Sequence, residues 1–148
     1  MAGISLATQD AVGADIDTGG FERIMDTNVL GVMRTVEGLQ DLVGPTGTIA
    51  AMSSGQGSAS GNTTGGFEVC RATKAALNQM FRSYAVRHEG ERCALLLMAP
   101  GWVKTDLGGP NAILEISDSI HPLINTIDAQ HGGSWLQYLD RHGKAVTW

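Results

Sequence analysis

Two short sets of residues in this 148-residue chain could carry chemistry. Ser53-Ser54 is a hydroxyl pair at the end of an apolar run, and Lys74 stands four residues after Cys70. A lysine beside a cysteine can lower the pKa of the thiol and make it reactive, and the alternative is an unreactive buried thiol. Serines at a strand end also form turns, and an isolated lysine commonly lies along the surface. Functional and structural interpretations therefore both stand at this point.

The residues around these sets predict alternating strands and helices. Continuous apolar runs predict buried strands at 48–52, 93–98 and 135–139. Apolar residues at three-and-four spacing predict helices at 21–42, 69–88 and 116–130. Because Pro122 lies inside the last of these, we expect that helix either to kink there or to restart with Pro122 in a first turn.

This alternation predicts one α/β domain over residues 1–148, with parallel strands and right-handed crossovers. The stretch 7–20 has no periodicity and predicts a loop. The stretch 53–66 is rich in Gly, Ser, Thr and Asn, and a loop of this length inside a compact domain is typically functional. Ligands of parallel sheets bind beyond the carboxyl ends of the strands, where Ser53-Ser54 and Pro100-Gly101 are both expected.

Composition and charge argue against several classes of partner. The net charge is −5 with no Lys/Arg cluster, which disfavours a nucleic-acid or anionic-membrane surface. No apolar run approaches a membrane span, and the first residues lack a secretory pattern. Two cysteines without pairing and four histidines without ligand spacing predict a reducing compartment and no metal site. We expect a cytoplasmic protein without a nucleic-acid or membrane partner.

Several ordered motifs resemble the short-chain dehydrogenase/reductase family. N-V-L-G contains Asn28, M-S-S contains Ser54, and A-T-K-A-A-L-N contains Lys74. The similarity is closest to the C-factor-like and sniffer-like carbonyl reductases, which share G-N-T-T-G-G, G-W-V-K-T-D-L-G-G-P-N-A and a terminal Trp. It covers the chain from end to end. The resemblance implies the carboxyl-terminal part of a Rossmann-type doubly wound parallel sheet, a three-layer α/β/α fold that lacks the first strands.

The resemblance also implies an oxidoreductase that uses NADP or NAD to interconvert a small carbonyl compound and an alcohol. Such a reaction needs a hydride at carbon and a proton at oxygen. In the family's pattern Ser54 holds the substrate oxygen, Lys74 the cofactor ribose and Asn28 a proton-relay water. The implied catalytic positions are Asn28, Ser54, Cys70 and Lys74. The implied cofactor-binding positions are Ala2, Gly3, Asn28, Lys74, Pro100, Gly101, Val103 and Thr105.

Two departures from the family's pattern predict weak activity. The family has a tyrosine where this chain has Cys70, and a thiol is shorter than a phenol and a weaker donor. Losing a general acid typically lowers a rate by about 10² to 10⁴. Neither Tyr84 nor Tyr138 can replace it by sequence position. No G-x-x-x-G-x-G opens a helix, and the family's first strands would precede Met1.

We therefore expect cofactor binding and activity of this chain to be impaired. An exposed strand edge would invite pairing with another chain. The alternative function is a non-catalytic remnant of the fold that acts as an interaction or signalling module. By resemblance, helices 21–42 and 69–88 would build a homo-oligomer.

Overall fold

The computed structural model describes residues 3–6, 12–90, 93–133 and 135–148. Its sheet has three parallel strands in the order β1 (Thr48–Met52), β2 (Ala94–Ala99) and β3 (Leu136–Asp140). Thr48 lies opposite Ala94, and Leu95 lies opposite Leu136. All six residues of the central strand β2 are buried, which explains its continuous apolar run. The predicted parallel α/β sheet is confirmed.

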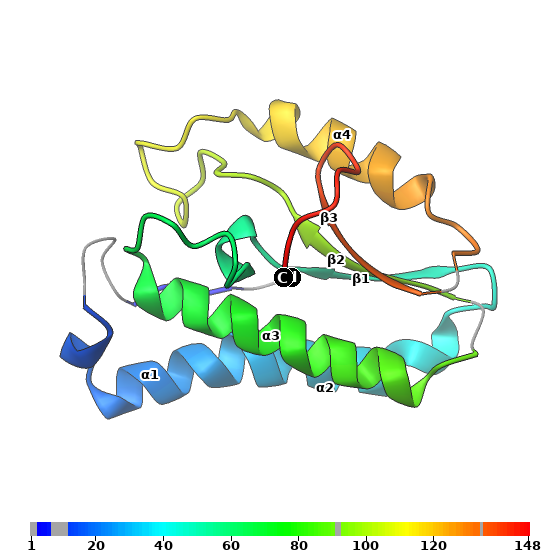
Figure 1. Ribbon diagram of the computed structural model, residues 1–148, viewed down its shortest axis with the longest axis horizontal. Coiled ribbons are helices and arrows are strands. Elements are labelled where there is room, and N and C mark those ends of the chain that lie inside the picture. The colour runs from blue at the N-terminus through cyan, green and yellow to red at the C-terminus, as the bar shows by residue number, and fades with distance from the viewer. Residues whose placement is uncertain (1–2, 7–11, 91–92, 134) are drawn as a thin grey trace.

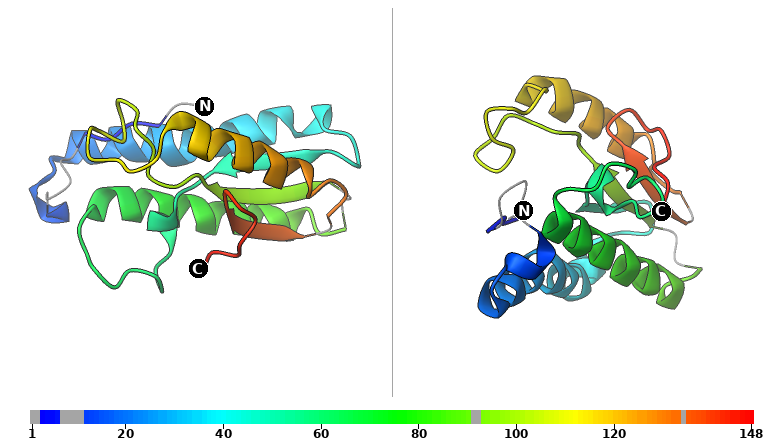
Figure 2. Two further views of the ribbon diagram at one scale, coloured as in Figure 1. Left: turned by 90° about the horizontal axis from the view of Figure 1, so that it is seen from above. Right: turned by 60° about the vertical axis from the view of Figure 1, so that its left-hand side comes forward.

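Helices cover both faces of this sheet (Figure 1). On one face lie α1 (Thr18–Met25), a π turn (Asp26–Leu30), α2 (Gly31–Leu39), a 3₁₀ turn (Gln40–Leu42) and α3 (Glu68–Arg87). The other face carries α4 (Ile116–Asp128). The right-hand view of Figure 2 shows the three layers in profile. The predicted α/β/α arrangement is therefore present.

The larger core lies between the sheet and the helices α2 and α3. Leu77, Phe81 and Tyr84 of α3 are fully buried there against β1, β2 and β3. On the opposite face, Leu123 of α4 packs with Leu96 in a smaller cluster. The larger core thus fixes α3 against the sheet. This helix carries the predicted site residues Cys70 and Lys74.

Three sequence predictions need correction at their boundaries. The predicted loop 7–20 ends too late, because α1 begins at Thr18, where the Asp17 carboxylate accepts a hydrogen bond from Gly20 N at 2.8 Å. A short 3₁₀ turn, Gly13–Asp15, also lies within it, and residues 7–11 are outside the described part. The second and third strands each begin one residue later than predicted.

Helix α4 does not restart at Pro122. It runs from Ile116 to Asp128 with the proline inside it. A capping box fixes its start before the proline, because Asp118 N donates to the Glu115 side chain and Glu115 N donates to Asp118 Oδ2 at 3.0 Å. None of the helices in the described ranges has the length and apolar character of a transmembrane span.

Candidate active site

Asn28 lies in the π turn between α1 and α2, and its side chain is buried. Its amide faces the backbone of Ile4: Oδ1 accepts from Ile4 N at 2.9 Å, and Nδ2 donates to Ile4 O at 2.8 Å. π turns are frequent at functional sites. The side chain is therefore fixed against the backbone of Ile4. Gly3 lies beside this amide, and Ala2 is outside the described residues.

The hydroxyl pair follows β1 directly. Ser53 is buried and donates to Asn78 Oδ1 of α3 at 2.5 Å. Ser54 is half-buried and caps the 3₁₀ turn Gly55–Gly57, where its Oγ accepts from Gln56 N at 3.2 Å. No acceptor for the Ser54 hydroxyl hydrogen is recorded among the described residues, so this hydroxyl can donate to a bound oxygen. Ser53 instead serves the packing of the loop against α3.

Cys70 and Lys74 are both half-buried on one face of α3. Lys74 Nζ donates to Met52 O at 3.0 Å, at the end of the strand that leads to Ser54. Burial lowers the pKa of the Lys74 ammonium, and the nearby Cys70 opposes this shift. The carboxyl edge of the sheet therefore brings Ser54, Cys70 and Lys74 into one region.

The alternative of a low-pKa thiol at Cys70 is not supported. Burial raises the pKa of Cys70, and the opposing effects of Lys74 and Arg71 are smaller. The thiol therefore stays protonated at neutral pH. Within the described ranges, no three side chains of His, Cys, Asp or Glu gather where they could hold a metal ion.

The sequence did not reveal the position of Tyr138 under the site. Its phenol reaches from β3 and donates to the carbonyl of Ser54. Burial raises the pKa of Tyr138, while its hydrogen bonds with Asn78 and Ser53 act in the opposite direction. The phenol thus supports the backbone under Ser54. Since it pairs with residues far along the chain, no local pattern could have indicated this contact.

The segment after β2 is folded back on itself. Gly101 has φ +88°, which favours glycine, and the Trp102 indole donates to Gly108 O at 2.8 Å. Thr105 Oγ1 accepts from Gly108 N at 3.0 Å, and Val103 beside it is half-buried. Pro100 O accepts from Ser119 Oγ of α4 at 2.8 Å. These predicted cofactor residues lie in one compact turn at the carboxyl end of β2.

The last residues of the described chain hold the loop 53–66 in place. Ser60 N donates to Trp148 O at 3.0 Å, and the hydroxyls of Ser58 and Thr147 lie 3.0 Å apart. The Trp148 ring lies 5.5 Å from that of Tyr138, and the Arg82 guanidinium is 5.0 Å above it. Thr147 and Trp148 therefore hold Ser58 and Ser60 of the loop that joins Ser54 to α3, a role that sequence reasoning missed.

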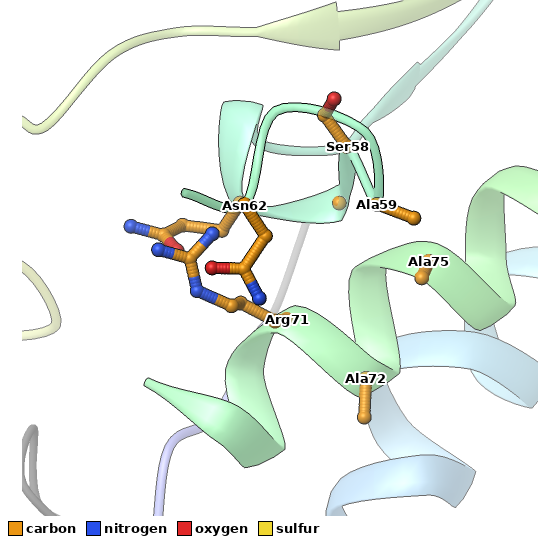
Figure 3. A pocket seen from close by; sticks show the side chains of 8 residues that line it. Ser58, Ala59, Asn62, Arg71, Ala72 and Ala75 are labelled. Atoms are coloured by element: carbon orange, nitrogen blue, oxygen red, sulfur yellow. The ribbon is translucent and has the colours of Figure 1, made fainter. Parts of the chain in front are cut away.

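A separate hollow of about 210 Å³ lies between this loop and the start of α3. Asn62 and Arg71 form one side of it, and Ala59, Ala72 and Ala75 form the other (Figure 3). Arg71 also donates to Gly66 O at 2.9 Å, which ties it to the loop. None of the predicted site residues lines this hollow, so it is distinct from the Ser54 region.

Comparisons with known proteins agree with this geometry. Residues 1–140 match the family model described as Enoyl-(Acyl carrier protein) reductase. The curated protein C-signal of Myxococcus xanthus is 35% identical over 141 residues, which are 90% of this chain and 82% of that protein.

Two solved structures have the same fold. A short-chain dehydrogenase/reductase of Burkholderia multivorans with bound NADP is 44% identical, with a TM-score of 0.96 over 99% of this chain. The carbonyl reductase Sniffer of D. melanogaster is 28% identical, with a TM-score of 0.84 over 100% of this chain. This chain spans 64% of the length of each of these two structures.

Proposed function

Because the chain belongs to the short-chain dehydrogenase/reductase family, we propose that the whole protein is an NADP- or NAD-dependent oxidoreductase that interconverts a small carbonyl compound and an alcohol. One observation carries this proposal. Lys74 Nζ binds Met52 O at the end of β1, so the amine lies beside the strand end from which Ser54 projects. This pairing supplies a hydroxyl donor and a cation at the edge where parallel sheets bind ligands.

Ser54, Lys74 and Asn28 would each have a separate role in this reaction. The Ser54 hydroxyl would donate a hydrogen bond to the substrate oxygen and hold it as negative charge develops there. Lys74 would bind a hydroxyl of the cofactor ribose. The backbone carbonyl of Asn28 would anchor a water that returns protons to the site.

The described residues fit one half of the cofactor. The turn after β2 would bind the carboxamide of the nicotinamide. It contains Gly101 in a left-handed conformation, followed by Val103 and Thr105. The G-x-x-x-G-x-G sequence, which would bind the pyrophosphate at a helix N-terminus, does not occur in the chain. When bound, the nicotinamide supplies the hydride.

Cys70 determines the rate of carbonyl reduction that we expect. Its thiol occupies the position of the family's tyrosine, and burial raises the pKa of Cys70, so it is a short and weak donor. We therefore infer slow carbonyl reduction, lower by about 10² to 10⁴ than with a phenol at this position.

Calorimetry with NADPH and then NADH tests the proposal on the chain as it stands. We expect weak cofactor binding, slow carbonyl reduction that disappears in Lys74→Ala, and faster reduction in Cys70→Tyr. Lys144→Ala, a change at an exposed lysine outside the site, is the matched control. A folded chain that binds neither cofactor would contradict the expected binding and activity of this chain by itself.

A second candidate is a non-catalytic interaction or signalling module. The protonated Cys70 thiol favours it, as do exposed apolar residues on the helical face: Leu42 is 81% exposed and Val86 is 55% exposed. We propose that a second copy would pack on helices 21–42 and 69–88. Sedimentation analysis at increasing concentration tests this, and a strictly monomeric chain would exclude self-association through that face.

A further inference from the structure

Arg71, near the start of α3, holds its guanidinium in a fixed orientation with one nitrogen left for a ligand. Nε donates to Gly66 O at 2.9 Å and Nη2 donates to Gly65 O at 3.0 Å, so the preceding loop fixes the planar group. Among the described residues, no acceptor is recorded for Nη1 and no carboxylate forms an ion pair with Arg71. Nη1 therefore offers two N–H donors on an uncompensated positive charge.

This guanidinium lines the hollow of about 210 Å³ between the loop 53–66 and α3 (Figure 3). The methyl groups of Ala59, Ala72 and Ala75 form the apolar wall. Gln56 also lines the hollow, and its Oε1 is buried with no hydrogen-bond partner recorded in the described part of the chain. A buried amide oxygen without a donor is unfavourable, so this atom favours a ligand with an N–H or O–H group.

The hollow lies on a different side of α3 from the proposed active site. Successive residues of an α-helix are turned by about 100° around its axis. Cys70 and Lys74 therefore share one side of α3, and the three hollow residues Arg71, Ala72 and Ala75 project to another. A ligand in the hollow would not occupy the position proposed for the substrate of the reduction.

Charge and size restrict the ligand that fits. A planar guanidinium without a carboxylate partner favours a carboxylate ligand. The alanine wall favours a short aliphatic chain, since a larger group would exceed the volume. With about 30 Å³ for each water molecule in the liquid, this volume corresponds to a ligand of fewer than about ten non-hydrogen atoms.

We propose that this hollow binds small aliphatic 2-amino or 2-hydroxy carboxylic acids. The ligand carboxylate accepts hydrogen bonds from Arg71 Nη1, and its N–H or O–H group donates to Gln56 Oε1. The aliphatic side chain packs on Ala59, Ala72 and Ala75. Binding requires no nicotinamide cofactor, so this site goes beyond the proposed reduction.

Calorimetry on the full chain tests the proposal with four matched compounds. L-valine and 2-hydroxy-3-methylbutanoate carry the carboxylate, the donor and the branched chain. 3-Methylbutanoate lacks the donor, and isobutylamine lacks the carboxylate. We expect a Kd of about 1 mM or below for valine, for the hydroxy acid or for both, and at least about fivefold weaker binding of the two controls. Equal binding of all four compounds, or no binding of the first two at about 10 mM, would overturn the proposal.

Three variants place the ligand in the hollow. Ala75→Leu fills the space while Arg71 and Gln56 stay in place, so binding should be lost. Arg71→Gln removes the cation and should weaken binding at least about tenfold. Gln79→Ala, at an exposed position of the same helix, is the matched control and should bind as the unmodified chain does. Urea unfolding verifies that each variant is folded. Unchanged binding in Ala75→Leu or in Arg71→Gln would contradict the proposed contacts.

Titration with NADPH is independent of this experiment. A chain that binds valine or the hydroxy acid in the hollow without binding NADPH supports this inference and counts against the expected cofactor binding. A chain that binds NADPH and none of the four compounds rejects this inference and leaves the proposed reduction standing.

Discussion

Gly57 of the loop lies directly against the backbone of Lys74. A Cβ placed on Gly57 would come within 3.0 Å of the Lys74 carbonyl carbon and 3.1 Å of its Cβ. It would also lie 2.8 Å from Asn78 Nδ2, which donates to Gly57 O at 3.3 Å. The absence of a side chain at Gly57 therefore sets how closely the loop after Ser54 approaches the helix that carries Lys74.

Gly57→Ala is expected to destabilise the chain by about 1–3 kcal/mol, since the added methyl meets backbone and a buried amide. Gly55→Ala, two residues earlier, is the matched control, because a Cβ there has no neighbour within 4 Å. It should change the free energy of unfolding by less than about 0.5 kcal/mol. Urea unfolding measures the free energy of unfolding of both variants. Equal losses in the two variants would show that Gly57 is not in tight contact with Lys74.

Alkylation of Cys70 by iodoacetamide should be slower than that of glutathione at neutral pH. The thiolate is the reacting form, and burial raises the pKa of this thiol. The rate should increase as the pH rises toward 9.0 and beyond. Mass spectrometry of the Cys70 peptide measures it, with Cys70→Ser as the blank. Faster alkylation than glutathione would instead indicate an activated thiol.

The stability lost by Lys74→Met should grow as the pH rises. Because burial lowers the pKa of Lys74 in the folded chain, the unfolded chain binds this proton more tightly, so the native protein gains stability between that lowered pKa and 10.5. The variant lacks this gain. The raised pKa of Cys70 lowers the stability of the folded chain as the pH rises above 9.0. Both proteins share this effect, so it largely cancels in the difference between their free energies of unfolding. Urea unfolding at about pH 7 and about pH 9 compares the two, and a constant difference would contradict the lowered pKa.

Tyr138→Phe is expected to cost at least about 0.5–1.5 kcal/mol, the usual value of one hydrogen bond, because the phenol also bonds with Asn78 and Ser53. The variant removes the phenol that donates to Ser54 O, although Gly57 N still donates to that oxygen at 2.9 Å. Ser83→Ala removes a hydroxyl that donates to a carbonyl on an exposed helix face, and it should cost less. Chemical denaturation of both variants measures the costs. A smaller effect for Tyr138→Phe than for Ser83→Ala would exclude support of Ser54 by the phenol.

The sequence predicted the parts of the fold that depend on local periodicity. The apolar run 48–52 became β1 with the predicted bounds, and the long helices came within a few residues of their predicted limits because their apolar spacing continues to the cap. The π turn at Asn28 could not be predicted, since it depends on a hydrogen bond from Gly31 N to Asp26 O within an otherwise helical pattern.

The neighbours of the candidate site were harder to predict. The resemblance to the family grouped Ser54, Cys70 and Lys74 as one predicted site, whereas the strand pattern alone placed only Ser53-Ser54 and Pro100-Gly101 at the carboxyl edge of the sheet. The supports of the site come from far along the chain: Tyr138 reaches Ser54, and Trp148 holds Ser60. Only the folded chain brings these residues together, so no spacing rule indicates them.

The parallel register also bears on how the chain reaches this structure. Every pairing of β1 with β2 joins residues on either side of the whole of α3, and β2 meets β3 only across α4. Such pairings are non-local. Closing the long loops between the strands costs conformational entropy before the hydrogen bonds between the strands can form and offset that cost. The helices can form locally much sooner. Refolding should therefore be slow for a chain of this length, with helical signal recovered ahead of the packing around Tyr138.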